Sequence, residues 1–170
     1  MRLFTALWPP PDVLDVVEGA VTGIADLPGW RPVPRERWHV TLAFHGEDDP
    51  DRRVAELDEL TGATAPTLRL AGTGSFPGVL WAGLETTDRA ALDALVAGAG
   101  GDPGTFTGHL TLARRSGRRR GAPPLPDLPP GPWWTPGEVL LVASERDASG
   151  LRYRAVHRVP LRSRHDDTDR

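Results

Sequence analysis

The stretch WHVTLAF at residues 38–44 returns in shortened form as HLTLA at residues 109–113. Both stretches alternate apolar and polar side chains, which is the pattern of a β-strand with one buried face. Each follows a predicted strand, at residues 3–8 and 79–85, and a predicted helix. Two strand–helix–strand units of similar size that end in His-x-Thr-Leu-Ala predict a duplicated fold. Its two lobes would be related by a pseudo-twofold axis, with the equivalent strands facing each other across a cleft.

The rest of the chain supplies the elements that complete these lobes. The first helix is expected from Asp12 onward, with six apolar side chains on its buried face: Val13, Val16, Val17, Ala20, Val21 and Ile24. A second helix is expected to begin at Pro50 with Asp49 as its N-cap, and a third spans residues 87–99. Further strands are expected at residues 67–70, 139–143 and 151–161, and loops at residues 28–34 and 116–137.

The length of 170 residues is typical of one domain. Residues 1–162 are expected to form that domain, with lobes that are interleaved in the sequence. The tail SRHDDTDR at residues 163–170 has no apolar side chain to bury, so it is expected to be disordered.

The composition excludes several kinds of chemistry. The chain has no cysteine, which removes thiol catalysis, disulfides and thiolate metal sites. All 20 basic residues are arginine, so a Schiff-base lysine and a P-loop lysine are also excluded. The net charge of −3 favours a small or terminal substrate over long nucleic acid. No apolar run approaches the roughly 18 residues of a membrane span and no signal-peptide pattern opens the chain, so a cytoplasmic location is expected.

The repeated motif brings together the groups that phosphoryl chemistry requires. Residues two apart on a strand share a face, so His39 lies beside Thr41, and His109 beside Thr111. An imidazole can hold or deliver a proton near neutral pH, and a hydroxyl can donate to an anionic oxygen. Two such pairs would hold a phosphate between two hydroxyls with an imidazole on each side, as in-line displacement at phosphorus needs. Either motif alone is an unremarkable surface strand; the recurrence favours catalysis.

Metal binding is the other function that a histidine pair suggests. His39 and His45 are six residues apart with a turn due at Gly46, and neither motif brings a carboxylate at ligand spacing. The sequence therefore predicts neither a metal site nor a cofactor.

Five segments in order, MRLFTALWPP, RWHVTLAFHGE, GSFPGVLWAGL, GHLTLAR and SERDASGLRY, resemble the 2H phosphoesterase superfamily. The resemblance covers nearly the whole chain. It is closest to the RNA 2′,3′-cyclic phosphodiesterase branch, whose members are also described as 2′–5′ RNA ligases. This resemblance implies an α+β, bilobal fold with two antiparallel sheets, flanked by helices, around a central cleft. It also implies metal-independent hydrolysis of an RNA terminal 2′,3′-cyclic phosphate to a 2′-phosphate.

The resemblance assigns roles to individual residues. His39 matches the proton donor of the family and His109 its proton acceptor, although spacing alone allows either assignment. Thr41 and Thr111 match the phosphate-binding hydroxyls. Arg114 matches a further substrate-binding residue, but strand alternation predicts that it lies on the face opposite His109.

Two other functions stay open at this stage. One is ATP-independent 2′–5′ RNA ligation by the reverse reaction, and the other is a non-catalytic nucleotide or RNA-binding module. The expected partners are RNA ends or small cyclic nucleotides as substrates. Neither a membrane nor an obligate protein partner is expected, and the chain is expected to be a monomer.

The remaining notable side chains have simpler interpretations. His157 is expected to be a hydrogen-bonded core residue, and Arg118 to Arg120 either form a solvated loop or steer a phosphate chain. The tryptophans are expected in two settings. Core positions are predicted for Trp8, Trp38 and Trp81, and positions that cover lobe edges or stack a base for Trp30, Trp133 and Trp134.

Overall fold

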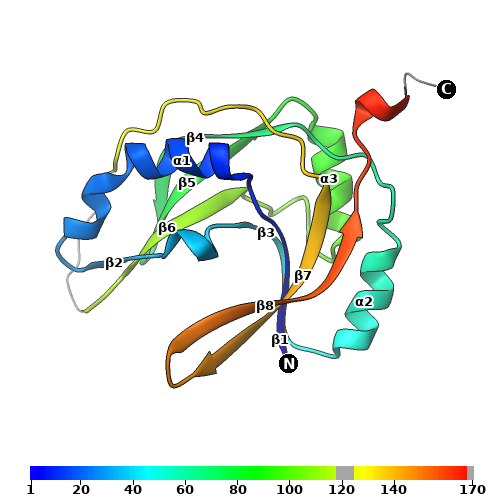
Figure 1. The fold of residues 1–170 in the computed structure, drawn as a ribbon, viewed down its shortest axis with the longest axis horizontal. Coiled ribbons are helices and arrows are strands. Elements are labelled where there is room, and N and C mark those ends of the chain that lie inside the picture. The colour runs from blue at the N-terminus through cyan, green and yellow to red at the C-terminus, as the bar shows by residue number, and fades with distance from the viewer. Residues whose placement is uncertain (118–124, 168–170) are drawn as a thin grey trace.

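The computed structural model describes residues 1–117 and 125–167 (Figure 1). Within these residues eight strands form one sheet in the order β4-β5-β6-β3-β1-β7-β8, and β2 pairs with β6 beside this path. The strands are β1 (Arg2–Leu7), β2 (Trp30–Pro32), β3 (Val40–Glu47), β4 (Leu68–Phe76), β5 (Val79–Thr86), β6 (His109–Arg115), β7 (Glu138–Asp147) and β8 (Gly150–Pro160). The helices are α1 (Pro11–Ala20), α2 (Pro50–Asp58) and α3 (Arg89–Gly98). The fold is therefore α+β, as expected.

The prediction of two separate sheets was wrong. One half of the sheet contains β2, β4, β5 and β6, and the other contains β1, β3, β7 and β8. Among the residues that the structure describes, a single pair, Val40 with Leu110, joins the two halves. The junction is short because β2 occupies the same edge of β6 from Ala113 to Arg115. Residues 28–34 had been predicted to be a loop, so this strand was missed.

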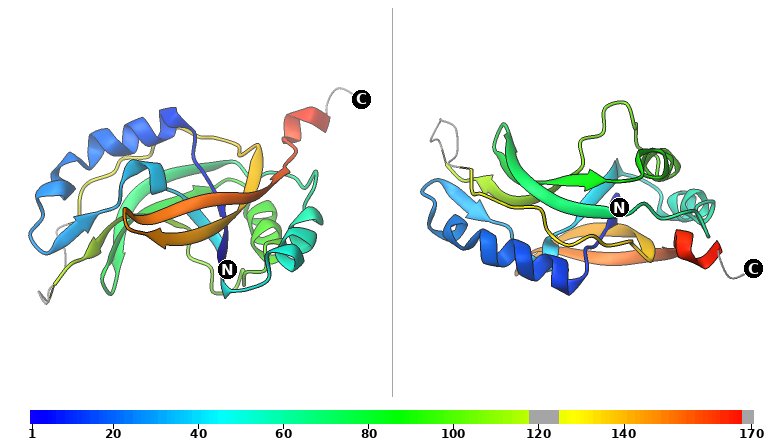
Figure 2. Two further views of the ribbon diagram at one scale, coloured as in Figure 1. Left: turned by 60° about the horizontal axis from the view of Figure 1, so that its bottom comes forward. Right: turned by 90° about the horizontal axis from the view of Figure 1, so that it is seen from above.

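Two helices, α1 and α3, connect the two halves by packing against the half that does not contain their preceding strand. α1 follows β1 in the chain but packs against β4 of the other half, and α3 follows β5 but packs against β3. α2 packs against β7 and β8. Figures 1 and 2 show α1 at one side of the molecule and α2 with α3 at the other. The halves are thus interleaved in space as well as in sequence.

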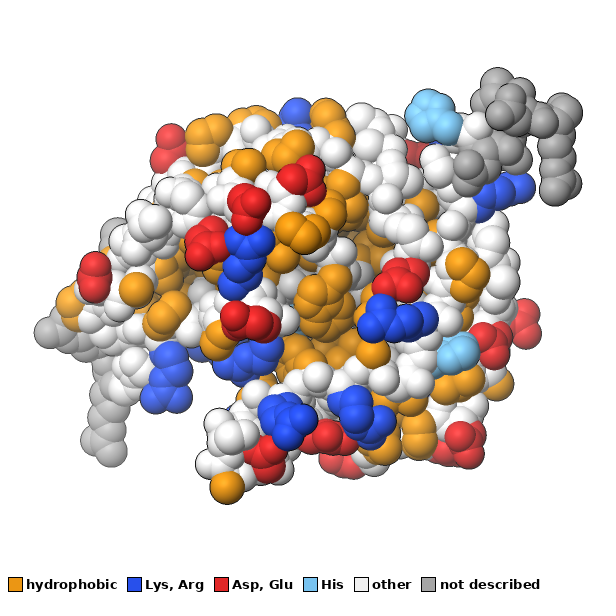
Figure 3. Space-filling model, in the orientation of Figure 1, with side chains coloured by type: hydrophobic (Ala, Val, Ile, Leu, Met, Phe, Trp, Pro, Cys, Tyr) orange, Lys and Arg blue, Asp and Glu red, His pale blue; other side chains and the backbone are white. Residues whose placement is uncertain are grey.

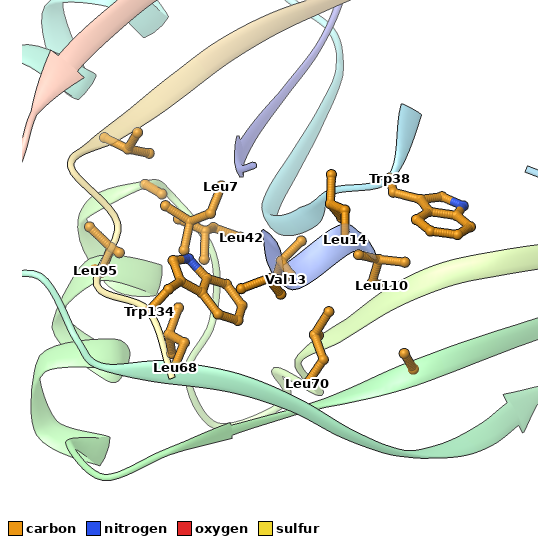
Figure 4. Packing of buried hydrophobic residues seen from close by; sticks show 14 of the residues in the cluster. Leu7, Val13, Leu14, Trp38, Leu42, Leu68, Leu70, Leu95, Leu110 and Trp134 are labelled. Atoms are coloured by element: carbon orange, nitrogen blue, oxygen red, sulfur yellow. The ribbon is translucent and has the colours of Figure 1, made fainter. Parts of the chain in front are cut away.

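A continuous hydrophobic core fills the space between the helices and the sheet. Leu7 and Leu42 from one half meet Leu68 and Leu70 from the other, and Trp134 packs among them (Figure 4). All five side chains are buried. A core shared by both halves explains how one residue pair suffices to join them.

Two helices match the sequence in part. α2 begins as predicted, because the Asp49 side chain accepts from the backbone N–H of Asp51 and Pro50 is the first helical residue. α1 ends earlier than predicted and continues as a 3₁₀ turn (Thr22–Asp26). Val16 is 44% exposed while Leu14 is buried, since Leu14 lies nearer the centre of the stripe formed by the other buried residues.

The segment predicted as a long exposed loop is mostly exposed where it is described, but two of its side chains reach the core. Leu128 and Trp134 are buried, and the backbone of Trp134 exchanges two hydrogen bonds with Leu68. The Arg118 to Arg120 run lies outside the described residues. The expected disordered tail begins instead with a 3₁₀ turn (Arg164–Asp167), in which Arg164 pairs with Asp88; residues 168–170 lie outside the described part.

His157 was expected in the core but lies near the surface, where Nε2 is 2.7 Å from Oδ1 of Asp58 on α2. Its expected hydrogen bond is present. Among the described residues, no helix has the length and apolar character needed to cross a membrane.

Candidate active site

The site lies around the pair of Val40 and Leu110, where β3 meets β6. Both side chains are 0% exposed and point into the core. Their sequence neighbours point to the opposite face, because side chains alternate along a strand. The neighbours on that face are the motif residues His39, Thr41, His109 and Thr111.

The antiparallel pairing also sets which motif residues are near each other. In such a pair, the residue after one strand position lies across from the residue before its partner. Thr41 is therefore on the side of His109, and Thr111 on the side of His39. Each imidazole has a hydroxyl from its own motif and one from the other motif around it.

Both imidazole rings are oriented by the same backbone contact. Nδ1 of His39 lies 2.6 Å from the carbonyl oxygen of Arg37, and Nδ1 of His109 lies 2.7 Å from that of Thr107. A carbonyl oxygen only accepts, so Nδ1 is the donor in both rings. Each neutral ring then keeps its lone pair on Nε2, which is the nitrogen able to exchange a proton with a substrate.

An aromatic cluster surrounds His39. Trp8 stacks on the imidazole with ring centroids 4.8 Å apart, and the rings of Phe4 and Tyr153 lie at 4.9 Å and 5.4 Å. On the remaining side Thr41 Oγ1 is 3.0 Å from His39 Nε2, where the hydroxyl can donate to the lone pair. Aromatic side chains thus contact the ring, and the Thr41 hydroxyl lies at Nε2.

This environment favours the neutral form of His39. Burial lowers the pKa of His39 from its ordinary value of 6.5 to about 4. The hydrogen bond to the Arg37 carbonyl opposes this effect, whereas the positive charges of Arg114, His109 and Arg37 add to it. In the free protein at neutral pH, His39 is therefore uncharged.

Fewer aromatic side chains surround His109 than His39, and they come from the other half of the sheet. Phe76, at the end of β4, meets its ring edge-on at 5.1 Å, and Trp81 of β5 lies at 6.2 Å. Trp81 was predicted in the core but lies half-buried on the face of the histidines, whereas Trp8, also half-buried, packs against a second hydrophobic cluster that contains Phe4. Trp38, in contrast, is buried as predicted.

The two motif strands carry the same irregularity. In β3 the pairing with β1 skips Leu42, and in β6 the pairing with β5 skips Leu112. Each skipped leucine is a β-bulge residue, and it and the alanine that follows are both buried. Sequence reasoning missed the bulges, although two consecutive buried apolar residues, Leu-Ala, occur at the same place in both motifs.

The bulge at Leu112 corrects the prediction for Arg114. Simple alternation would put Arg114 on the core face, but the extra residue reverses the order, so Arg114 pairs with Val79 on the same face as His109 and Thr111. Its side chain is exposed, and its charge acts on His39. All five residues named by the resemblance thus come to one face of the sheet.

The metal interpretation of His39 and His45 loses its geometric basis. His45 Nε2 lies 2.8 Å from Oγ1 of Thr5, a residue only 1% exposed on the core side of the sheet, whereas His39 is on the other face. Within the described chain, no group of three or more His, Asp or Glu residues lies close enough together to hold an ion.

Comparison with known proteins identifies the family of this chain. The family model described as LigT like Phosphoesterase matches residues 7–82, which include the first motif. A relative from Thermus thermophilus, named RNA 2′,3′-cyclic phosphodiesterase, is 33% identical over 97% of this chain and 92% of its own length. The chain belongs to the LigT-like phosphoesterase family and is a phosphoesterase.

Solved structures extend the similarity to the whole fold. A crystal structure of a Thermus thermophilus protein is 33% identical, covers 97% of this chain and 100% of its own, and has a TM-score of 0.72. Escherichia coli LigT in complex with phosphate is 25% identical, with a TM-score of 0.71 over 94% of this chain and 96% of its own. The same protein complexed with ATP gives the same identity and TM-score, over 94% of this chain and 97% of that one.

Proposed function

We propose that this phosphoesterase hydrolyses the 2′,3′-cyclic phosphate at RNA ends to a 2′-phosphate, with His39 and His109 as its acid–base pair and without a metal. The observation that carries the proposal is the convergence of two histidines, two threonines and Arg114 on one face around the Val40–Leu110 pair. The name of the Thermus thermophilus relative supports the same substrate.

The reaction needs one proton removed and one delivered. His109 Nε2 takes a proton from water as the water oxygen forms a bond to phosphorus. The bond from phosphorus to the 3′-oxygen breaks, and His39 Nε2–H protonates that oxygen. The products are a 2′-phosphate and a 3′-hydroxyl, and the proton that His109 gained returns through solvent to His39.

The common orientation of the two rings supports proton transfer through Nε2. With Nδ1–H held by the carbonyls of Arg37 and Thr107, neither ring can rotate to offer Nδ1 without losing a hydrogen bond. The hydroxyls of Thr41 and Thr111 and the guanidinium of Arg114 would bind the non-bridging oxygens.

The lowered pKa of His39 has a direct consequence for its role as the acid. In the free protein the ring is neutral, so it must take up a proton when the anionic substrate binds. The negative phosphate beside it raises its pKa, while the desolvated, low-pKa imidazolium is a strong donor toward the departing alkoxide.

The substrates would be RNA ends or small cyclic nucleotides, bound by a monomer made from residues 1–162. Hydrolysis is favoured over the reverse ligation, because water at roughly 55 M outcompetes a 5′-hydroxyl by mass action unless the site excludes it. No feature of the described residues favours ligation or simple binding over hydrolysis.

One experiment tests the proposal. The protein is incubated with an oligonucleotide that ends in a 2′,3′-cyclic phosphate, with excess EDTA, and the product is identified by mass spectrometry and by its sensitivity to phosphatase. We expect a terminal 2′-phosphate at an undiminished rate. Loss of turnover on chelation that a divalent ion restores would overturn the two-histidine mechanism, and a joined product would favour ligation.

A further inference from the structure

The strand that the sequence did not predict, β2, brings a second arginine to the site. Arg31 lies directly opposite Arg114 in the β2–β6 ladder. Residues directly opposite each other in antiparallel strands have their side chains on the same face. Because Arg114 is on the face of His109 and Thr111, Arg31 is on that face as well, on the strand that shares an edge of β6 with β3.

This juxtaposition is unfavourable without an anion. Like charges directly opposite each other on a sheet are destabilising. Both side chains are exposed, and neither lies within ion-pair distance of a carboxylate of the described residues. Arginines elsewhere, such as Arg35, Arg52 and Arg69, do have carboxylate partners.

The row that contains the two arginines continues across the sheet. Val79 lies beyond Arg114 on β5, and Phe76 beyond Val79 on β4. The row thus runs from two guanidiniums to the aromatic ring that touches His109. Figure 3 shows a hollow between the surface over β2 and β6 and the β7–β8 hairpin, with basic side chains on both sides of it.

We propose that Arg31 binds the phosphodiester that precedes the terminal cyclic phosphate, so that the enzyme prefers an RNA chain end to a cyclic mononucleotide. This inference rests on the proposed function. If Arg114 contacts the cyclic phosphate, Arg31, whose strand backbone lies about 4.8 Å away across the ladder, is positioned for the next phosphate along the chain. A single Arg–phosphate contact is a charge-assisted, potentially bidentate hydrogen bond.

The test compares two substrates in the wild type and in Arg31→Gln. One is 2′,3′-cyclic AMP, and the other is the dinucleotide ApA with a terminal 2′,3′-cyclic phosphate. We expect the ratio of kcat/KM for the dinucleotide to that for the mononucleotide to fall about 10-fold in Arg31→Gln, mainly through KM, as for the loss of one charged hydrogen bond. Arg89→Gln on α3 makes the same change in net charge away from the site and should leave the ratio unchanged.

A modified substrate isolates the contact. When the internal linkage of the dinucleotide is a neutral methylphosphonate, the kcat/KM ratio of the wild type should fall by the same factor of about 10. The Arg31→Gln substitution should then cause no further decrease in that ratio. The thermal midpoint of Arg31→Gln should be no lower than that of the wild type, because the like-charge pair is removed.

Each outcome decides one question. If the wild type cleaves neither substrate, the proposed function fails. If it cleaves both but the ratio is unchanged in Arg31→Gln, or the methylphosphonate substrate still responds to the substitution, the inference about Arg31 fails while the function stands.

Discussion

In the described part of the chain, Val40 and Leu110 form the one residue pair that joins the two halves of the sheet, and the candidate catalytic side chains flank it on the opposite face. The pair thus belongs to the core and fixes the site at the same time. A shift of β3 relative to β6 would separate His39 from His109 without breaking either motif. The distance between the two imidazoles depends on packing beneath the sheet.

We therefore expect Leu110→Ala to affect stability and activity together. Truncation of a fully buried leucine lowers the free energy of unfolding by about 2–5 kcal/mol. Leu95→Ala on α3 removes the same atoms from a 1% exposed position away from the junction and is the matched control. At a temperature where both variants are folded, kcat should fall more in Leu110→Ala. Equal kcat values in the two variants would argue that the junction does not set the geometry of the site.

The roles of the two histidines as acid and base should be distinguishable with substrates that differ in their leaving group. His39→Ala and His109→Ala should each lower kcat/KM for a cyclic phosphate by on the order of 10²–10⁴-fold. A nucleotide ester with p-nitrophenolate as leaving group needs no acid, so it should restore turnover in His39→Ala much more than in His109→Ala. Rescue of His109→Ala instead would reverse the assigned roles, and near-full activity of either variant would remove that residue from the mechanism.

The threonines should matter less than the histidines. Thr41→Val and Thr111→Val keep the β-branched shape and remove one hydroxyl donor to charge that is already present in the bound substrate, so we expect losses on the order of 10-fold. Thr41→Ser and Thr111→Ser retain the hydroxyl and are the controls. Steady-state kinetics on 2′,3′-cyclic AMP checks both pairs, and a serine variant as impaired as its valine counterpart would exclude the hydroxyl as the cause.

The sequence predicted the motif residues because their chemistry and their alternation are local properties. It could not predict Arg114 on the site face, since the bulge at Leu112 depends on how β6 pairs with β5. Nor could it predict β2: Trp30 to Pro32 is short, contains a proline, and becomes a strand only because the edge of β6 is available. Long-range pairing decided the points where local patterns failed.

The aromatic side chains around His39 are a second feature that local sequence patterns could not predict. Phe4 and Trp8 contact the imidazole in the fold although they come from the start of the chain, and Tyr153 comes from β8 near its end. Their apolar character correctly predicted strands at Phe4 and Tyr153, but not that β1 would end before Trp8, or that these rings would surround an imidazole instead of joining the main core.

The rate of the reaction should depend on pH in a bell shape. Below the lower pKa of the pair both imidazoles are protonated and no base remains; above the higher one no acid remains. Because kcat/KM reports the free enzyme, its acidic limb should have a midpoint near 4, where His39 takes up its proton. The acidic limb of kcat should lie at higher pH, because bound phosphate raises the pKa of His39. An acidic limb of kcat/KM at pH 6 or above would contradict the lowered pKa.

The lowered pKa of His39 should also make the free energy of unfolding depend on pH, and this can be measured without turnover. In the unfolded chain His39 binds a proton near pH 6.5, but in the folded protein only near 4. Between these values the unfolded state binds more protons, so the free energy of unfolding falls as the pH is lowered, by up to about 1.4 kcal/mol per pH unit for this one group. His39→Gln and His39→Phe remove the titrating group, so both should lose less stability than the wild type between pH 7 and pH 5 in urea unfolding. The readout is the change with pH within each protein, so it is unaffected by the stability lost with the Arg37 hydrogen bond.

His45→Gln should also lose less stability than the wild type as the pH falls, because burial lowers the pKa of His45 too. A pH dependence in both His39 variants identical to that of the wild type would mean that His39 titrates alike in the folded and unfolded chain.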